Sequence, residues 1–363
     1  MKSAWNRSNA QFLAAYGKSS HAEGSDTFAY GAIAHAEGYH TLAQGKASHA
    51  EGSSTAAIGN YSHAEGTKTT AIGVSAHAEG SNTTAHGEYS HAEGGSEVTF
   101  AALLNKYNRE KNTNLNLDNI SHGDIYNVWK FGQETTDYAA LAFASGHSEG
   151  YNNLAIGGHA EGDQTYAKLN AHAEGCGTEA RGLGSHAEGE GTSAIGIYSH
   201  AEGKDTTAYY PYAHAEGTST RASRDNAHAE GFRSVAEGMS SHAEGSTFAR
   251  GDYSHAEGKS SFFPIYLTGS DGTYTYSVDS PNLILEPGGI IFVDNLSYNI
   301  ETVNKESNEI SIDFPPSEQW ENKKGLFTYF GALGYCSHVE GDSTKATGSC
   351  AHASGLRTEA TGQ

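Results

Sequence analysis

The sequence predicts an all-β fold, a parallel β-solenoid of 14-residue coils, and three features of an internal repeat support this. The tetrapeptide His-Ala-Glu-Gly recurs with a regular period, for example at His49, His63 and His77. Small residues alternate with larger ones in two short stretches per repeat, the period-2 pattern of strands. Two glycines in every repeat would also destabilise a helix. The repeat histidines, including variant tetrapeptides, are His21, His35, His49, His63, His77, His91, His147, His159, His172, His186, His200, His214, His228, His242, His255, His338 and His352.

One coil, for example residues 48–61, contains Ser-His-Ala-Glu-Gly, two variable residues, Thr-x-Ala-x-Gly and two more variable residues. This pattern predicts two short strands and two tight turns, with glycine closing each strand. A single coil cannot bury a core, so the coils must stack, each strand pairing with its equivalent about 4.8 Å away.

The smallest side chains are expected inside the coil. The predicted interior residues of one region are Ser62, Ala64 and Gly66 on the first strand and Thr55, Ala57 and Gly59 on the second. Such an interior buries much less than large aliphatic side chains, each of which contributes ~1.5–3 kcal/mol. We therefore expect oligomerisation to supply the missing stability.

The outward positions of the first strand are nearly always His and Glu, whereas those of the second strand vary freely. A solvated face needs no such uniformity, so the His/Glu face is expected to pack against copies of itself around a symmetry axis. We name this row the His/Glu ladder. Its predicted axial residues are His21, Glu23, His35, Glu37, His49, Glu51, His63, Glu65, His77, Glu79, His186, Glu188, His200 and Glu202.

The ladder leads to an expectation about acid. If a carboxylate of a neighbouring chain pairs with each imidazole, the histidine pKa lies above ~6.5 and the assembly is more heat-stable at pH 6 than at pH 9. If burial dominates instead, the pKa falls and mild acid weakens the assembly. Pairing is the favoured alternative, because an unpaired buried Glu would be costly.

Two segments interrupt the repeat. Residues 95–146 begin with a predicted helix at 100–111 and regain large apolar residues at 124–129, which indicates an inserted α/β segment with its own core. Residues 259–336 predict a small β-barrel or sandwich with strands at 262–267, 273–278, 290–293, 298–303 and 309–314. Its aromatic residues are core candidates or sugar-stacking platforms. The candidate ligand-binding residues are Phe262, Phe263, Tyr266, Tyr274, Tyr276 and Trp320.

Composition excludes several classes of partner. With 43 acidic and 22 basic side chains the formal net charge is −21, which disfavours nucleic acid and anionic membrane surfaces. No apolar run approaches the ~18 residues that span a bilayer, and residues 1–16 lack the pattern of a secretory signal.

Three cysteines are too few for a disulfide framework. Cys336 and Cys350 stack in neighbouring coils, and we expect two buried thiols there.

The His-x-Glu pairs could ligate zinc or iron, but a structural ladder is the preferred interpretation, so no metal and no cofactor are expected. Catalysis is not expected either, because many equivalent positions cannot each provide a distinctive environment. No phosphate loop, serine elbow or metalloprotease motif is present.

Residues such as Ala56-Ala57-Ile58-Gly59 and Thr70-Ala71-Ile72-Gly73 resemble the head repeats of trimeric autotransporter adhesins. That resemblance implies a left-handed parallel β-roll and a homotrimer. The Ser-His-Ala-Glu-Gly variety is more similar to repeats of phage tail-fibre and appendage proteins. The implied organisation is an N-terminal segment (1–20), roll repeats (21–94, 147–258 and 337–363) and the insertions at 95–146 and 259–336.

The resemblance implies a trimeric phage tail fibre or appendage that binds a host-surface glycan or protein and contacts other virion or baseplate proteins. The alternative is a fragment of a bacterial surface adhesin, and the third is a polysaccharide-degrading tailspike. Neither an export signal nor an anchor barrel is found in the sequence, and it ends within a repeat, which favours the phage-type interpretation.

Overall fold

The computed structural model confirms a parallel β-solenoid with few helices. It describes residues 12–117, 120–135, 139–259, 263–269, 275–279, 290–293, 296–304, 306–307, 309–312, 320–328 and 331–361. The chain divides into two compact units, residues 1–203 and 204–363. Among the described residues, no helix has the length and apolar character needed to cross a membrane.

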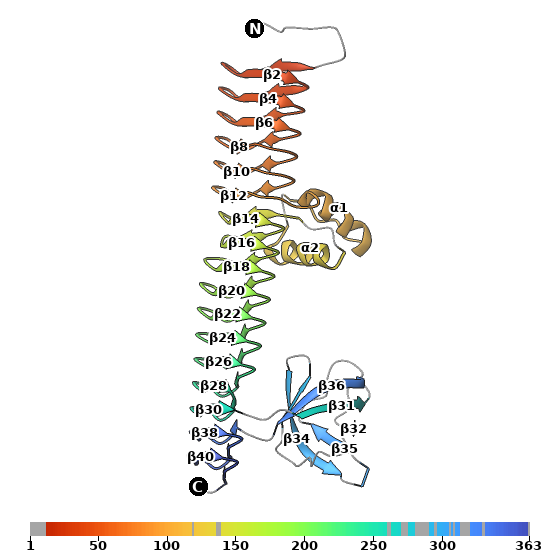
Figure 1. Ribbon diagram of the computed structural model, residues 1–363. Coiled ribbons are helices and arrows are strands. Elements are labelled where there is room, and N and C mark those ends of the chain that lie inside the picture. The colour runs from red at the N-terminus through yellow and green to blue at the C-terminus, as the bar shows by residue number, and fades with distance from the viewer. Residues whose placement is uncertain are drawn as a thin grey trace. The chain divides into compact units, whose positions relative to one another are not determined.

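In the first unit each coil contributes one strand to each of two parallel sheets (Figure 1). The histidine-bearing strands are β2 (His21–Ser25), β4 (His35–Tyr39), β6 (His49–Ser53), β8 (His63–Ala64), β10 (His77–Ala78), β12 (His91–Ala92), β14 (His147–Tyr151), β16 (His159–Asp163), β18 (His172–Cys176), β20 (His186–Glu190) and β22 (His200–Lys204). The second series is β1 (Leu13–Ala15), β3 (Thr27–Ala29), β5 (Leu42–Ala43), β7 (Ala56–Ala57), β9 (Thr70–Ala71), β11 (Thr84–Ala85), β13 (Leu141–Phe143), β15 (Leu154–Ile156), β17 (Tyr166–Ala167), β19 (Glu179–Ala180) and β21 (Ser193–Ala194).

Equivalent residues of neighbouring coils pair directly. His49 pairs with His63, and His63 with His77, in unbroken register. His91 pairs with His147 although the first insertion separates them in sequence. The insertion therefore leaves and re-enters the roll between two coils that are neighbours in space.

The predicted interior is confirmed for five of its six residues, but Gly66 is half-buried and lies with Glu65 in an open groove on the surface of the roll. Ala57 and Ala64 are fully buried, and Thr55 and Ser62 nearly so. The Ser62 hydroxyl donates to the Gly59 carbonyl oxygen at 2.7 Å, which satisfies one buried polar group inside the coil. The alanines stack into a continuous but thin core of methyl groups.

The repeat glycines are required by stacking more than by turn geometry. A Cβ on Gly59 would lie 1.9 Å from the carbonyl oxygen of Gly73 in the next coil. Gly66 has a φ of +101° as well, a conformation that L-residues rarely adopt. The left-handed turn positions belong mostly to other residues, for example Tyr61 and Lys68, so the expectation that glycine alone closes the turns is too simple.

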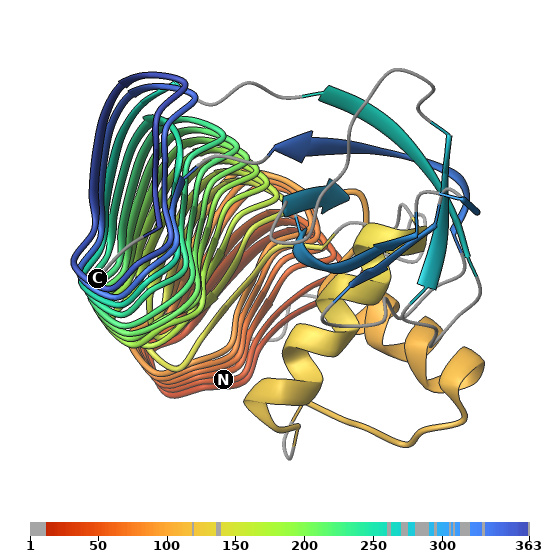
Figure 2. The same ribbon diagram turned by 90° about the horizontal axis from the view of Figure 1, so that it is seen from below.

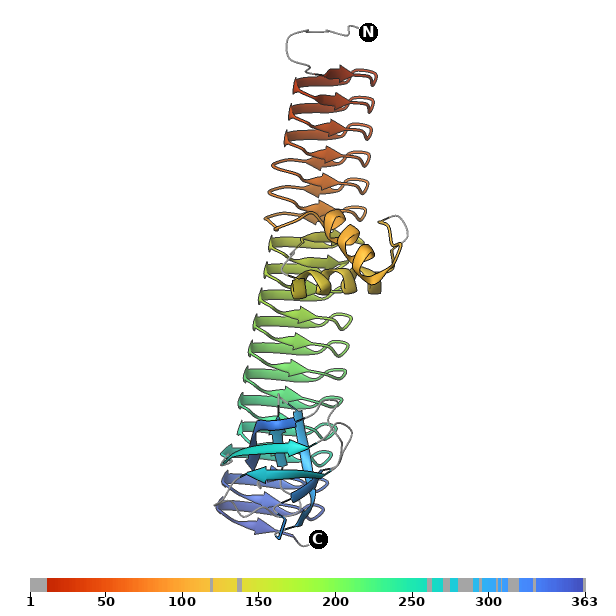
Figure 3. The same ribbon diagram turned by 90° about the vertical axis from the view of Figure 1, so that its right-hand side faces the viewer.

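The first insertion consists of two helices, α1 (Phe100–Lys111) and α2 (His122–Thr135). The predicted helix at 100–111 is confirmed: the Thr99 side chain caps its N-terminus, and Asn112, with a φ of 52°, ends it. Both helices pack on outward side chains of the second strand series, including Leu141, Leu154 and Tyr166. Figure 3 shows the two helices lying against the roll.

The second unit repeats the roll. Its histidine-bearing strands are β24 (His214–Thr218), β26 (His228–Phe232), β28 (His242–Ser246), β30 (His255–Lys259), β38 (His338–Asp342) and β40 (His352–Leu356). The second series is β23 (Thr207–Ala208), β25 (Arg221–Ala222), β27 (Val235–Ala236), β29 (Phe248–Ala249), β37 (Gly331–Ala332), β39 (Lys345–Ala346) and β41 (Glu359–Ala360). Viewed along the stack, the successive coils of each unit nearly superimpose (Figure 2). His255 pairs with His338 across the second insertion.

The second insertion is a closed antiparallel barrel. Its described strands are β31 (Phe263–Gly269), β32 (Thr275–Asp279), β33 (Ile290–Val293), β34 (Leu296–Asn304), β35 (Glu309–Ile312) and β36 (Trp320–Thr328). The sequence predicts five strands and misses β36, which pairs with both β31 and β33 and closes the barrel. Glu, Asn, Lys and Gly, residues disfavoured in strands, fill the middle of β36 and hide it in the sequence.

The cysteine expectation is wrong. Cys336 and Cys350 are exposed free thiols, as is Cys176. Cys336 and Cys350 occupy the left-handed turn position two residues before a repeat histidine, with φ of 49° and 55°. A side chain at that position leaves the coil and does not enter its interior.

Candidate functional site

The imidazoles of the His/Glu ladder form a stacked column. From His35 to His186 in the first unit, successive rings lie 4.6–4.9 Å apart between centroids and within 3–12° of parallel. The rings are less parallel at both ends of this unit. The angle between the ring planes is 67° for His21 and His35, and 30° for His186 and His200. From His214 to His255 in the second unit, rings stack within 2–6° of parallel. Parallel register brings these side chains next to one another, because each histidine opens its strand at the same position.

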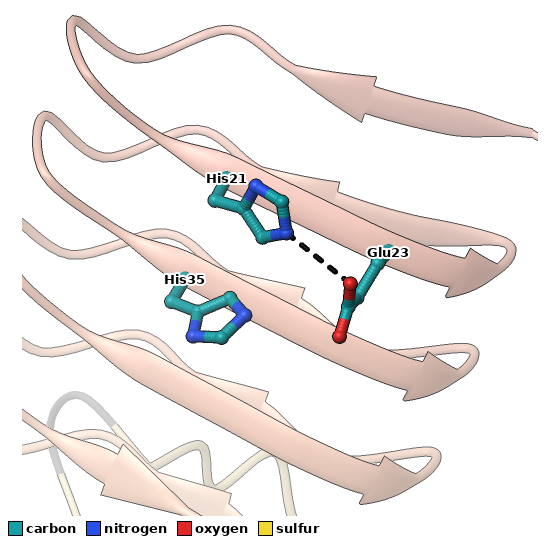
Figure 4. A group of neighbouring side chains, drawn as sticks. All are labelled: His21, Glu23 and His35. Carbon is teal, nitrogen blue, oxygen red and sulfur yellow. Dashed lines mark hydrogen bonds and ion pairs between the residues drawn. The ribbon is translucent and has the colours of Figure 1, made fainter.

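In most coils the histidine faces the glutamate two residues later on the same strand. Figure 4 shows this pair in the first coil, where His21 Nε2 and Glu23 Oε2 lie 3.3 Å apart. In twelve further coils the separation between His Nε2 and Glu Oε2 is 3.4–4.0 Å. About a third of each side chain is exposed in the middle of the first unit, for example 35% for His63 and 34% for Glu65.

Most of these contacts are too long for hydrogen bonds, which reach about 3.2 Å. The Nε2 atom itself is buried and has no hydrogen-bond partner among the described residues in many coils. The histidines concerned are His35, His49, His63, His77, His91, His147, His159, His172, His186, His228, His242, His255 and His338. A buried polar atom without a partner is costly and calls for an explanation.

The carboxylates form a second column beside the imidazoles. Glu37, Glu51, Glu65 and Glu79, with glycines of the same coils, line an open groove of about 550 Å³. Hydrogen bonding to neighbouring carboxylates, together with burial, raises the pKa of Glu51 and of Glu79 to about 7. Glu65 between them has a lowered pKa because it accepts those hydrogen bonds. Glu51 and Glu79 therefore take up protons near neutral pH and share them with the carboxylates of the neighbouring coils.

The histidine pKa values shift opposite to the favoured expectation. Burial within the stack, followed by repulsion from the neighbouring imidazoles, lowers the pKa of His63 and of His91. His49, His186, His228 and His255 shift in the same direction, with burial again the main cause. The nearby carboxylates raise these pKa values by less. Within a single chain, burial therefore outweighs pairing.

The outward face of the second strand series is already occupied over part of the first unit. There α1 and α2 bury Leu141, Leu154 and Ile156. Glu179, only 7% exposed, lies in an ion-pair cluster with Lys130 of α2 and with Arg181, and Tyr126 donates a hydrogen bond to it.

Sequence reasoning missed this cluster. Burial and the Glu179 charge raise the pKa of Tyr126, so its hydroxyl stays protonated and donates. The available signal was the pair of opposite charges, Glu179 and Arg181, at the two outward positions of one second strand.

Of the aromatic candidates of the barrel, the structure describes the side chain of Tyr276. Tyr276 is 1% exposed and packs in the barrel core with Leu267 and Ile310, so its assignment to ligand binding is wrong. Phe262 and Tyr274 lie outside the described residues. Phe263, Tyr266 and Trp320 lie in strands β31 and β36, but their side chains are outside the described part of the chain.

The ladder also contains groups with metal-ligand chemistry. In several coils one glutamate and two successive histidines place three ligand atoms within 4.8 Å of one another, for example His147, Glu149 and His159. Further groups follow in the next coils, among them His159, Glu161 and His172.

Comparison with known families finds the YadA head domain repeat (2 copies) at residues 36–62, 64–90 and 187–209. These stretches lie where the repeat keeps its 14-residue period without exception. No curated protein matches the chain. The matched repeats and the solenoid fit an adhesin-like structural protein.

Proposed function

We propose that this protein is a homotrimeric surface-attachment protein, in which the β-roll is a scaffold and the helical pair and the barrel are displayed modules. The main support is the way the insertions are joined to the roll. His91 pairs with His147, and His255 with His338, so each module is spliced between adjacent coils without interrupting the stack. A scaffold that tolerates such splicing is suited to presenting binding surfaces.

The trimer is proposed on two grounds. Regular coils bury alanine, serine and threonine, a small hydrophobic gain compared with the ~1–2 kcal/mol of backbone entropy lost per ordered residue. The helices already cover the second-strand face around Leu141 and Leu154. Over those coils the His/Glu face is the sheet surface that remains for contact between copies, which supports an axial ladder.

Two biological settings suit this assembly. A phage tail fibre or appendage would use the modules to contact a host-surface glycan or protein and would dock on other virion proteins. A bacterial surface adhesin would use the same modules from the cell surface, and the YadA head repeats support it at least as well. We expect no catalytic activity in either setting.

Attachment is tested by binding of fluorescent protein to candidate host cells. The comparison variant replaces residues 260–330 with a short Gly-Ser linker, because β30 and β38 already pair as neighbours. We expect the full chain to bind and the variant to lose most of that binding while keeping its β-sheet circular dichroism. Equal binding by both proteins would show that the barrel does not contribute to attachment.

Light scattering tests the oligomeric state, and a folded monomer at micromolar concentration would contradict the trimer. Mass spectrometry of purified virions and of washed cell envelopes separates the two settings.

A further inference from the structure

The separation between His and Glu in each coil suits a shared metal ion better than a direct contact. Zinc binds imidazole nitrogen at about 2.0–2.1 Å and carboxylate oxygen at about 2.0–2.2 Å, so two ligands of one tetrahedral ion lie roughly 3.3–3.5 Å apart. His91 Nε2 lies 3.4 Å from Glu93 Oε2, and His214 Nε2 lies 3.4 Å from Glu216 Oε2. In most other coils the separation between His Nε2 and Glu Oε2 would have to shorten by only a few tenths of an ångström to fit one ion.

A third ligand comes from the neighbouring coil. Glu79 places one oxygen 3.8 Å from His77 Nε2 and the other 4.0 Å from His91 Nε2. Glu230 similarly lies 3.9 Å from His228 and 3.6 Å from His242. Each carboxylate can therefore engage a cation held by its own histidine or by the next one.

The unpartnered nitrogen atoms are an independent observation in the same place. Nε2 of His35, His77 and His147 is buried beside the carboxylates and lacks a hydrogen-bond partner among the described residues. A neutral imidazole nitrogen is a lone-pair donor, and a cation between it and the carboxylate would satisfy both groups.

We propose that the His/Glu ladder is a row of binding sites for a borderline first-row divalent cation, Zn²⁺ or its analogues. Each site is formed by a His Nε2 and a Glu carboxylate of one coil, with the histidine of the next coil within reach. Mixed imidazole and carboxylate ligation favours Zn²⁺, Co²⁺, Ni²⁺ and Cu²⁺ over Mg²⁺ and Ca²⁺, which prefer oxygen ligands. All these ligands belong to one chain, so the sites do not depend on the trimer.

Charge limits how many sites fill at once. Successive coils are ~4.8 Å apart, and two divalent cations at that distance repel strongly. Each coil with a His-x-Glu pair contributes one carboxylate, and an imidazole that binds a cation is neutral, so one divalent cation per two coils balances the charge. We therefore expect about one bound Zn²⁺ per two ladder coils.

The experiment measures Zn²⁺ bound to the full-length protein after chelator treatment and equilibrium dialysis. The ladder variant carries Glu37→Gln, Glu51→Gln, Glu65→Gln and Glu79→Gln, the four carboxylates of the groove. The matched control carries Glu88→Gln, Glu110→Gln, Glu134→Gln and Glu306→Gln, four exposed glutamates away from the ladder with the same change in net charge. We expect the ladder variant to bind about two fewer Zn²⁺ per chain and the control to match the original protein.

Three results would overturn the proposal. One is unchanged Zn²⁺ stoichiometry in the ladder variant, and another is an equal loss in the control, which would indicate nonspecific attraction to an acidic protein. The third is displacement of Zn²⁺ by millimolar Mg²⁺ or Ca²⁺, which would indicate a carboxylate groove without histidine ligands. If the ladder variant does not fold, Co²⁺ bound to the original protein gives the answer. Intense visible bands of low-coordinate Co²⁺ would support the sites, and the weak bands of octahedral Co²⁺ would contradict them.

Discussion

The imidazoles of His63 and His77 stack face to face, 4.8 Å between centroids and 6° from parallel, although they belong to successive coils of the chain. The stack shields each ring from water and places it next to another potential cation. Burial and the neighbouring imidazoles together lower the pKa of His63. The His63 imidazole therefore favours the neutral form.

The first prediction is that mild acid destabilises the metal-free protein. An unfolded histidine takes up a proton near pH 6.5, whereas the folded one with a lowered pKa does so only at lower pH. The unfolded state then binds more protons below pH 6.5, and stability falls as the pH drops through that window. We expect the melting temperature in EDTA to be lower at pH 5.5 than at pH 7.5.

The carboxylates oppose this trend in part. Glu51 and Glu79, with pKa values of about 7, stabilise the fold as the pH falls from about 7 towards 4.5. Glu23 and Glu65, whose pKa values are lowered, act in the opposite sense only below about pH 4.5. Within the measured window, six histidines with lowered pKa values therefore act against two carboxylates with raised ones. The control is the variant His63→Gln/His77→Gln, which should show a smaller drop. A melting temperature that rises in acid would contradict this prediction and support the pairing of His with Glu of a neighbouring chain that the sequence led us to expect.

The repeat predicts the roll so well because each position of the coil has one structural role. Alternation assigns Ala57 and Ala64 to the interior, and the 14-residue period assigns the register of His49 with His63. The two insertions lack this redundancy. The second helix was missed although Ile125, Val128 and Trp129 follow helical spacing and are buried. Gly123 and Gly132 within it lower helix propensity, and packing on the roll overrides that cost.

The site was only partly predictable for a related reason. The sequence places His and Glu on one face. Side-chain rotamers, which no sequence pattern specifies, set the separation within each pair, for example 3.7 Å for His63 and Glu65. They also determine how the rings stack. The direction of the histidine pKa shifts depends on how far burial, which lowers the pKa, exceeds the effect of the nearby carboxylates, which raise it, and the sequence does not specify the burial of each ring. Whether the ladder lies on a trimer axis stays a prediction.

The second prediction concerns the glycines that face the next coil. Gly59→Ala should destabilise the roll by ~1–3 kcal/mol or more, because the added methyl group overlaps the Gly73 carbonyl oxygen at 1.9 Å and the stack must open. Chemical denaturation measures the loss. The control is Gly177→Ala, where nothing lies within 4 Å of the new Cβ and a left-handed φ of +64° is the only cost, ~1 kcal/mol. A loss in Gly59→Ala no larger than the loss in Gly177→Ala would mean that the next coil moves away from the methyl group at little cost, and that stacking does not require the repeat glycine.

The third prediction tests the corrected cysteine positions. Because Cys176, Cys336 and Cys350 are all exposed, a thiol reagent such as Ellman's reagent should titrate three thiols in the native protein under reducing-agent-free conditions. The same count is expected after denaturation. One fast thiol followed by two more only after unfolding would show that Cys336 and Cys350 are buried in the native protein, as the repeat pattern first indicated.

The last prediction concerns the attachment of α2 to the roll. Glu179 is 7% exposed and holds Lys130 and Arg181, so Glu179→Gln leaves two cations without their shared carboxylate. Hydrogen bonds to a charged group contribute ~1.5–3 kcal/mol, and the partial exposure of both cations reduces the loss to ~1–2 kcal/mol. Hydrogen exchange followed by mass spectrometry should show faster exchange of the amides of α2, while the alanine core of the roll around Ala57 keeps its protection. Glu134→Gln, a change at an exposed residue of the same helix, is the control and should leave exchange unaltered. Equal protection of α2 in both variants would mean that apolar packing by Trp129 and Ile125 alone holds the helix, and that the Glu179 cluster contributes nothing to its docking.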